Sequence, residues 1–301
     1  MYQEARYQEA YDLISGEASS PDAIPAMIYY LRYSFACRAG KHDLAMDIFR
    51  EAVKDKGFWY SSIYLDDDDL EPLRARPEFE RLVAICRERE ETVQHDAVPE
   101  FELVIPRASR NGGKPALIVA LHGNQLNIST TKIEWCGDPL ADCLVALPQS
   151  SHAVCTGAYS WVDPAIGSQE VIAHLDGVMQ KEIADPSRVI VGGFSAGGRV
   201  ALHMLLNGKF RANGIILLGP WLPDLVAMEP MIPDLRSAGV KVYLICGDQD
   251  KDCYDSTNRF AELLEACEVP FRYRIVSGMG HCYPTDFHEE LSKARSFILG
   301  E

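Results

Sequence analysis

The spacing of apolar positions changes near residue 95 and divides the chain into two regions. Before this point apolar residues recur every three to four positions, as on one face of a helix, and β-branched runs are scarce. Helical spacing is clearest over residues 42–53 and after Pro77, and a start signal at residues 20–22 predicts a further helix. The pattern therefore predicts an all-helical domain over residues 1–95.

From residue 100 onward, short β-branched runs alternate with helical stretches. The predicted strands cover residues 101–106, 116–123, 143–149, 188–195, 214–221, 241–248 and 271–278. The predicted helices cover residues 171–183, 196–207, 256–267 and 287–299. Because the strands are apolar along almost their whole length, they predict a mostly parallel sheet covered by helices on both faces. Residues 96–301 are thus expected to form an α/β domain whose functional groups gather at the carboxyl ends of the strands.

Charge and cysteine content narrow the class of protein. The 301 residues carry a formal net charge of -15 with no basic tract, which argues against nucleic acid and membrane surfaces as partners. The N-terminus lacks the basic start and apolar core of a signal peptide, and no apolar run reaches the roughly 18–20 residues that span a bilayer. Nine cysteines at irregular spacing, without a CxxC pair, predict reduced thiols, no zinc ribbon and a cytoplasmic location.

The fourth predicted strand runs into GFSAG (residues 193–197), and a helical pattern follows at once. So sharp a turn from strand to helix strains the serine and leaves no room for side chains two positions to either side, where Gly193 and Gly197 stand. A phosphate-binding loop fits less well, because no Gly-Lys-Ser/Thr follows and Phe194 occupies a position that would need glycine. Ser195 is therefore the predicted nucleophile, and a purely structural glycine turn is the remaining alternative.

A serine nucleophile needs a base, and three histidines follow it in the chain. His203 falls within the helix after the serine, and His288 belongs to the amphipathic last helix. His281 follows the last strand on a glycine-bracketed loop, SGMGH, that allows close approach. We therefore predict His281 as the general base.

The base in turn needs a carboxylate to hold its tautomer. The strand before His281 ends in GDQD (residues 247–250), and Asp250 has moved far enough past the strand to turn toward that histidine. Asp248 is the alternative, although it is better placed to bond the loop backbone. The order Ser195, Asp250, His281 is the one that a serine hydrolase on such a sheet requires.

An oxyanion needs two amide donors. Ala196 supplies the first, because it follows the nucleophile and begins the helix. The loop after an earlier strand, LHGN (residues 121–124), supplies the second, with the amide of Asn124 as the predicted donor. His122 in this loop is expected to orient backbone and not to act as a base.

The residues predicted to contact substrate are Phe194 beside the nucleophile and two aromatic residues, Tyr159 and Trp161, on the loop over residues 149–168. Only about 20 residues, Leu222 to Val240, stand where large lids are often inserted, so we expect at most a small apolar flap there.

Taken together, LHGN, GFSAG, GDQD and SGMGH resemble the α/β-hydrolase superfamily over roughly residues 100–300. LPQS after the third predicted strand and YSWVD before the helix that precedes the serine make the chain most similar to the phospholipase/carboxylesterase group, which includes acyl-protein thioesterases. This resemblance implies hydrolysis of carboxylic esters or thioesters through an acyl-enzyme, without metal or cofactor. Ala196 stands where acyl-protein thioesterases usually carry glutamine, and Asn124 replaces an apolar residue.

Within the helical region, RAGKHDLAMDIFREAV (residues 38–53) resembles a tetratricopeptide repeat. One repeat cannot build a peptide-binding groove, since about three stacked units are needed for stability. We expect a helical cap that packs on its neighbour or joins copies of the chain into a homo-oligomer.

The leading hypothesis is therefore a serine carboxylesterase that acts on small-molecule esters with short or medium acyl groups. A serine peptidase on the same fold remains open, because the triad is common to both chemistries. A non-catalytic protein that binds a partner through its helical domain is the third hypothesis.

Overall fold

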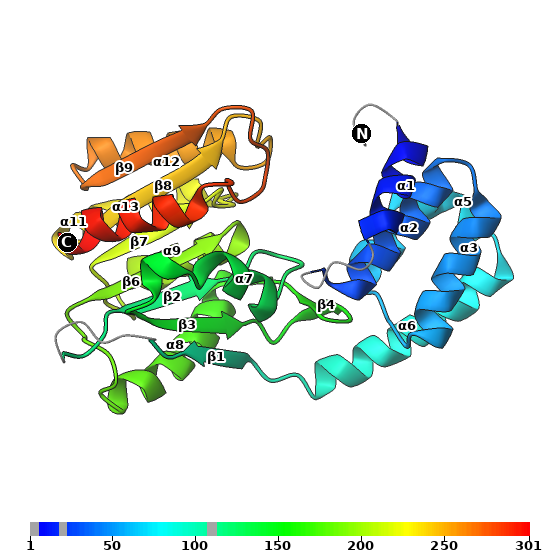
Figure 1. Ribbon diagram of the computed structural model, residues 1–301, viewed down its shortest axis with the longest axis horizontal. Coiled ribbons are helices and arrows are strands. Elements are labelled where there is room, and N and C mark those ends of the chain that lie inside the picture. Colours follow the sequence, from blue (N-terminus) through cyan, green and yellow to red (C-terminus); the bar gives the residue numbers. More distant parts are fainter. Residues whose placement is uncertain (1–5, 18–22, 107–112) are drawn as a thin grey trace. The chain divides into compact units, whose positions relative to one another are not determined.

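A computed structural model of the chain describes residues 6–17, 23–106 and 113–301 (Figure 1). The chain divides into two compact units: residues 1–98 with 151–160, and residues 99–150 with 161–301.

The first unit is helical, as predicted. Its helices are α1 (Tyr7–Glu17), α2 (Pro25–Arg38), α3 (His42–Arg50), the π-helical turn η1 (Glu51–Asp55), α4 (Ser62–Leu65), the 3-10 turn η2 (Asp68–Leu70), α5 (Glu71–Arg74) and α6 (Pro77–His95). The sequence pattern did not predict α1. The predicted helix start at residues 20–22 lies outside the described residues, and α2 begins at Pro25 because a residue before proline, here Ile24, is held extended. Whether this unit is tetratricopeptide-like stays a prediction.

A hairpin from far along the sequence completes the helical unit. It consists of β4 (Ala153–Cys155) and β5 (Ala158–Tyr159), which the sequence division assigned to the second domain. Ala153, Val154, Cys155 and Ala158 are buried in the core of the helical unit. The Val154 carbonyl accepts a hydrogen bond of 2.9 Å from the amide of Ser61, and the Gln94 side chain accepts one of 3.0 Å from the amide of Ala153. The division at residue 95 was thus wrong for this segment, because apolar residues in so short a run do not indicate which core they join.

The second unit is built on a sheet of seven strands within the described residues, in the order β1-β3-β2-β6-β7-β8-β9. The strands are β1 (Glu100–Val104), β2 (Leu117–Leu121), β3 (Leu144–Gln149), β6 (Val189–Phe194), β7 (Gly214–Leu218), β8 (Lys241–Gly247) and β9 (Phe271–Val276). Only the edge pairing of β1 with β3 is antiparallel. The mostly parallel sheet predicted from the sequence is confirmed.

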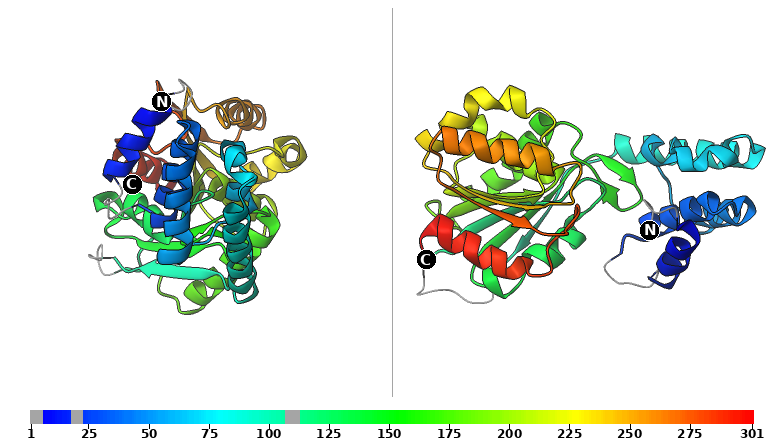
Figure 2. Two further views of the ribbon diagram at one scale, coloured as in Figure 1. Left: turned by 90° about the vertical axis from the view of Figure 1, so that its right-hand side faces the viewer. Right: turned by 90° about the horizontal axis from the view of Figure 1, so that it is seen from above.

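Helices cover both faces of this sheet, as Figure 2 shows from above. The helices and 3-10 turns of the unit are α7 (Ile128–Trp135), η3 (Asp138–Leu140), α8 (Pro164–Gln180), α9 (Ala196–Leu206), α10 (Leu225–Met228), η4 (Glu229–Met231), α11 (Ile232–Ser237), α12 (Tyr254–Ala266) and α13 (Phe287–Leu299). Side chains of α8, α9, α11 and α12 share one core with Leu117 and Val119 of β2, whereas α7 and α13 share the other with Ile118 and Ala120. Because successive side chains of β2 point to opposite faces of the sheet, alternate residues of this strand belong to the two cores.

Helix α8 begins seven residues earlier than its predicted range. The Asp163 carboxylate accepts a hydrogen bond of 2.7 Å from the amide of Ala165 and so caps the first turn. Residues 164–168, predicted to be loop, are therefore helical.

None of the helices in the described part of the chain is both long and apolar enough to cross a membrane.

Substituting the hairpin tests its place in the helical core. Val154 is 4% exposed, whereas Val162, just beyond the hairpin, is 65% exposed. We expect Val154→Asp to lower the midpoint of thermal unfolding by roughly 5–15 °C, because it buries an unpaired charge. Val162→Asp should change the midpoint little. Circular dichroism of both variants checks this, and a tolerated Val154→Asp would contradict the placement.

Candidate active site

Ser195 stands at the turn between β6 and α9 with φ 54° and ψ -121°, a left-handed backbone that non-glycine residues rarely adopt. Flanking glycines make this turn possible. A Cβ on Gly193 would lie 2.5 Å from the carbonyl carbon of Gly197, and one on Gly197 would lie 2.7 Å from the Leu121 carbonyl oxygen. Strain at a half-buried serine, held by close backbone packing on both sides, is typical of a functional site.

Ala196 is the first residue of α9, so its amide is among the first-turn donors that have no acceptor inside the helix. A Cβ on Gly197 would also collide with the carbonyl oxygen of His122, which places the end of β2 directly against the start of α9. The two predicted oxyanion loops are thus neighbours, and the positive end of the α9 dipole favours negative charge between them.

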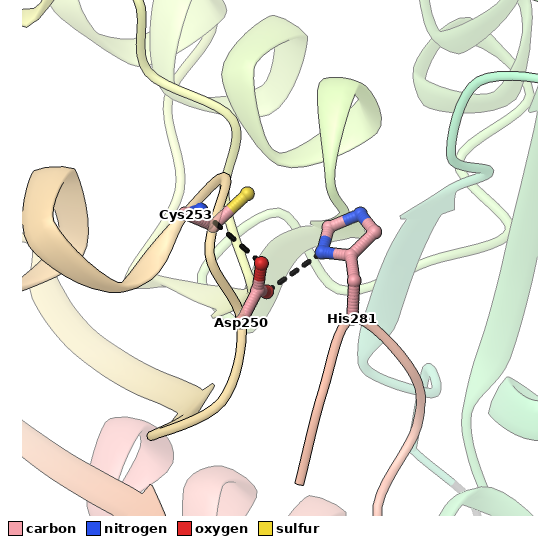
Figure 3. A group of neighbouring side chains, drawn as sticks. All are labelled: Asp250, Cys253 and His281. Carbon is pink, nitrogen blue, oxygen red and sulfur yellow. Dashed lines mark hydrogen bonds and ion pairs between the residues drawn. The ribbon is translucent and has the colours of Figure 1, made fainter. Parts of the chain in front are cut away.

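Asp250 and His281 come from the loops after β8 and β9 and point toward one another (Figure 3). Asp250 Oδ2 lies 2.7 Å from Nδ1 of His281, and Asp250 Oδ1 accepts a hydrogen bond of 3.1 Å from the backbone amide of residue 253. The carboxylate is 2% exposed, and the His281 side chain is 33% exposed. Two donors therefore hold a buried carboxylate, which in turn fixes the imidazole with Nε2 free to exchange a proton with substrate.

Asp248, the alternative acid, is engaged elsewhere. Its Oδ1 accepts a hydrogen bond of 2.7 Å from the amide of Gly278, and this bond lowers the pKa of the carboxyl. Asp248 thus ties the loop after β8 to the loop that carries His281, as the sequence suggested for a residue so close to the strand.

The other two histidines after the serine also have partners. Nδ1 of His203 lies 2.8 Å from the hydroxyl of Ser168 on α8. Nε2 of His288 lies 3.0 Å from the carbonyl oxygen of Glu134. His281 is the one of the three that meets a carboxylate at hydrogen-bond distance among the described residues.

Two residues that the sequence analysis did not assign to the triad support it. The ring of Phe194, predicted to contact substrate, stacks on His281 with centroids 4.6 Å apart, which links the nucleophile's neighbour to the base. A Cβ on Gly219, after β7, would lie 3.0 Å from Oδ2 of Asp250 and 3.3 Å from Nδ1 of His281. The Gly-Pro pair at the end of a predicted strand was the available signal for Gly219.

Trp161 holds the loop that carries the second predicted oxyanion donor. Its backbone amide donates to the Asn124 side chain at 2.8 Å, and its indole N–H donates to the His122 carbonyl at 2.8 Å. Its ring also stacks on that of His122, with centroids 4.7 Å apart. Trp161 is 2% exposed, so little of the ring is left to contact substrate.

His122 is fully buried, and burial lowers the pKa of its imidazole to about 4. Its Nδ1 donates to the Gly123 carbonyl at 2.7 Å, and its Nε2 accepts from the amide of Ser150 at 3.2 Å. Both ring nitrogens therefore bond backbone, which fits the orienting role expected of this residue.

The remaining predictions about substrate contacts concern Tyr159 and the segment after β7. Tyr159 belongs to the helical unit, where it packs against the core, and its contact with substrate stays a prediction. The segment expected to form an apolar flap buries five apolar side chains in the sheet unit and leaves Val226 83% exposed. The buried side chains are Leu222, Leu225, Met228, Ile232 and Leu235.

Trp221 was missed by the sequence analysis. Its backbone amide donates to the Ser195 carbonyl at 3.2 Å, and its exposed indole lies 5.3 Å from the Arg199 guanidinium. The Gly-Pro-Trp sequence after β7 therefore bonds to the backbone of the predicted nucleophile and leaves an apolar ring exposed.

Comparison with known proteins agrees with this geometry. Residues 1–94 match a family described as an A/B hydrolase-like N-terminal domain, and residues 167–299 match the phospholipase/carboxylesterase family. An uncharacterized protein from Bacillus cereus is 33% identical, with a TM-score of 0.59, over 99% of this chain and 94% of its own.

Two thioesterases are also similar. Acyl-protein thioesterase 1 from Gibberella zeae is 27% identical over 130 residues, which are 42% of this chain and 54% of that protein, so the match spans about half the length of this relative. Acyl-protein thioesterase 2 from Zea mays is 20% identical over 67% of this chain and 99% of its own, with a TM-score of 0.54, and shares the fold.

The two aspartates of GDQD provide a matched pair for testing the acid. We expect Asp250→Asn to lower turnover of an activated ester by roughly 10⁴-fold, because the amide no longer holds the imidazole in the tautomer that accepts a proton. Asp248→Asn should retain most of the activity. Steady-state kinetics with p-nitrophenyl butyrate checks both, and the reverse ranking would move the role to Asp248.

The low pKa of His122 predicts how stability depends on pH. Below about pH 6.5 the unfolded chain binds a proton that folded His122 does not bind until about pH 4, so the free energy of unfolding falls across this window. By pH 5 the loss is about 2 kcal/mol from this residue. Urea unfolding of the protein and of His122→Gln at pH 7.5 and pH 5 checks this. An equal pH dependence in both would show that folded His122 titrates normally.

Proposed function

Because the chain belongs to the phospholipase/carboxylesterase family of α/β-hydrolases, we propose that it is a serine esterase that acts on short or medium acyl esters through an acyl-enzyme. The observation that carries the proposal is the 2.7 Å bond between the buried Asp250 carboxylate and His281. The strained backbone of Ser195 supports the proposal as well, since serine hydrolases on this kind of sheet carry the nucleophile at a strained turn between a strand and a helix N-terminus.

In the acylation step, Nε2 of His281 takes the proton of Ser195 as the serine oxygen attacks the acyl carbonyl carbon. Asp250 stabilises the imidazolium that forms. The amides of Ala196 and Asn124 donate hydrogen bonds to the carbonyl oxygen and so stabilise the negative charge that develops on it. His281 then gives its proton to the alcohol oxygen, the ester bond breaks, and the acyl group stays on Ser195.

In the deacylation step, His281 takes a proton from water, and the resulting hydroxide attacks the acyl carbon. The bond to Ser195 breaks, and the serine oxygen recovers its proton from His281. The carboxylic acid is released and the enzyme is restored. Each proton passes through His281, so the proposed reaction requires no cofactor.

The preference for short or medium acyl groups is supported by the segment after β7. Five of its apolar side chains belong to the sheet-unit core, and the exposed Val226 does not by itself form a broad apolar lid of the kind that interfacial lipases use. The backbone of Trp221 bonds to the Ser195 carbonyl, and its exposed indole offers an apolar contact for a small acyl group. Thioesters are included among the substrates to be tested, because acyl-protein thioesterases are among the similar proteins.

The proposal is tested with a fluorophosphonate probe and a series of p-nitrophenyl esters from acetate to dodecanoate, together with an acyl thioester and a peptide panel. We expect the probe to label Ser195 and the acetate and butyrate esters to turn over fastest. Ser195→Ala should lose labelling and at least about a thousandfold in turnover, because the covalent intermediate cannot form.

Asp248→Asn is the matched control, since it alters the same face of the molecule and leaves the proposed triad intact. Equal turnover by the protein and Ser195→Ala would contradict the serine mechanism. Cleavage of peptides at rates above those of every ester would favour the peptidase hypothesis instead.

A further inference from the structure

The buried acid of the proposed triad has a thiol beside it. Cys253, at the start of α12, lies next to Asp250 in Figure 3 and is 1% exposed. One donor atom from each of Asp250, Cys253 and His281 lies within 4.8 Å of the other two. No step of the proposed reaction uses this thiol.

The three donors have the chemistry of a zinc site. Carboxylate oxygen, thiolate sulfur and imidazole nitrogen are the ligands that Zn²⁺ takes, at about 2.0–2.3 Å. Tetrahedral binding at these lengths sets donors about 3.3–3.8 Å apart. The three donors start within 4.8 Å of one another, and the 2.7 Å hydrogen bond between Asp250 and Nδ1 of His281 has to open for that pair of atoms to bind one ion. The exposed edge of His281 provides a side from which an ion can enter.

Charge also favours a divalent ion here. A divalent ion that displaces the thiol proton is balanced by one carboxylate and one thiolate. The bound site thus carries no net charge, which removes the main penalty for burying an ion.

We propose that Asp250, Cys253 and His281 form an inhibitory site for Zn²⁺ or a similarly thiophilic divalent ion, with a fourth position open to solvent. On binding, the Cys253 thiol releases its proton to water as the metal–sulfur bond forms. The proposed reaction needs both ring nitrogens of His281, because Nδ1 bonds Asp250 and Nε2 transfers the proton. An ion bound to either nitrogen therefore blocks the reaction. The metal and the ester therefore compete for the same histidine.

Binding is measured first, in a way that does not depend on activity. The full chain, freed of metal with a chelator, is titrated with Co²⁺, and the thiolate-to-cobalt charge-transfer band is followed in the near ultraviolet. We expect a band at one ion per chain that Zn²⁺ displaces. Cys253→Ser should lose it, Cys282→Ser should keep it because that exposed thiol lies outside the group, and His281→Ala should weaken the affinity at least about tenfold.

Inhibition, which unlike binding rests on the proposed function, is measured with p-nitrophenyl butyrate. Micromolar Zn²⁺ should inhibit the protein and Cys282→Ser, EDTA should restore both, and Mg²⁺ should have no effect, since it avoids thiolate ligands. Cys253→Ser should need at least about tenfold more Zn²⁺ than the unsubstituted protein to reach the same fractional inhibition, measured against its own activity without Zn²⁺.

The binding and inhibition experiments distinguish failure of the metal site from failure of the proposed esterase function. A cobalt band without any esterase activity would uphold the site and overturn the proposed function. Esterase activity with no band, or with an equal band in Cys253→Ser, would overturn the site and show that the thiol is a core side chain only. If Cys253→Ser does not fold, the affinity loss in His281→Ala decides the question.

Discussion

The constraint on which the catalytic unit depends is the left-handed backbone of Ser195. Such a backbone costs free energy, of order 1–3 kcal/mol, and persists only where the surroundings leave the chain no alternative. Here the amide of Ser195 is fixed by the Leu218 carbonyl at 3.0 Å, and glycines on both sides let β6 and α9 meet without a side chain between them. The neighbouring strand β7 and the close packing of β6 on α9 thus hold the strained backbone of Ser195 in place.

The same close packing brings the other strand ends to the serine. Gly197 lies against the His122 carbonyl, so the end of β2 reaches the start of α9. Gly219 lies against the bond between Asp250 and His281, where any side chain would press on the acid and the base. Three strand ends therefore meet at the serine because glycine stands where each backbone comes closest. A Cβ at Gly197 would collide with the His122 carbonyl oxygen, and one at Gly219 would press on Asp250 and His281, so a larger residue at either position would force these groups to shift.

Burial of the acid has two opposing consequences. With its carboxylate out of solvent, Asp250 holds His281 by a hydrogen bond of 2.7 Å, which is the arrangement that the proposed reaction requires. The same buried anion, with the thiol of Cys253 at its side, is an attractive partner for a thiophilic cation. Catalytic competence and sensitivity to metal are therefore expected to come from one carboxylate.

The periodicities along the chain predicted the helical unit, the sheet and the strand ends where the candidate site residues lie. The sequence also placed Ser195 and His281, because a serine between glycines and a histidine on a glycine loop each depend on neighbours in the chain. Contacts in the folded chain place residues 151–160 in the helical unit, Trp161 against the loop of His122 and Asn124, and Asp250 in place of Asp248 beside His281. These outcomes depend on contacts between segments far apart in the sequence, which no local pattern of polar and apolar residues specifies.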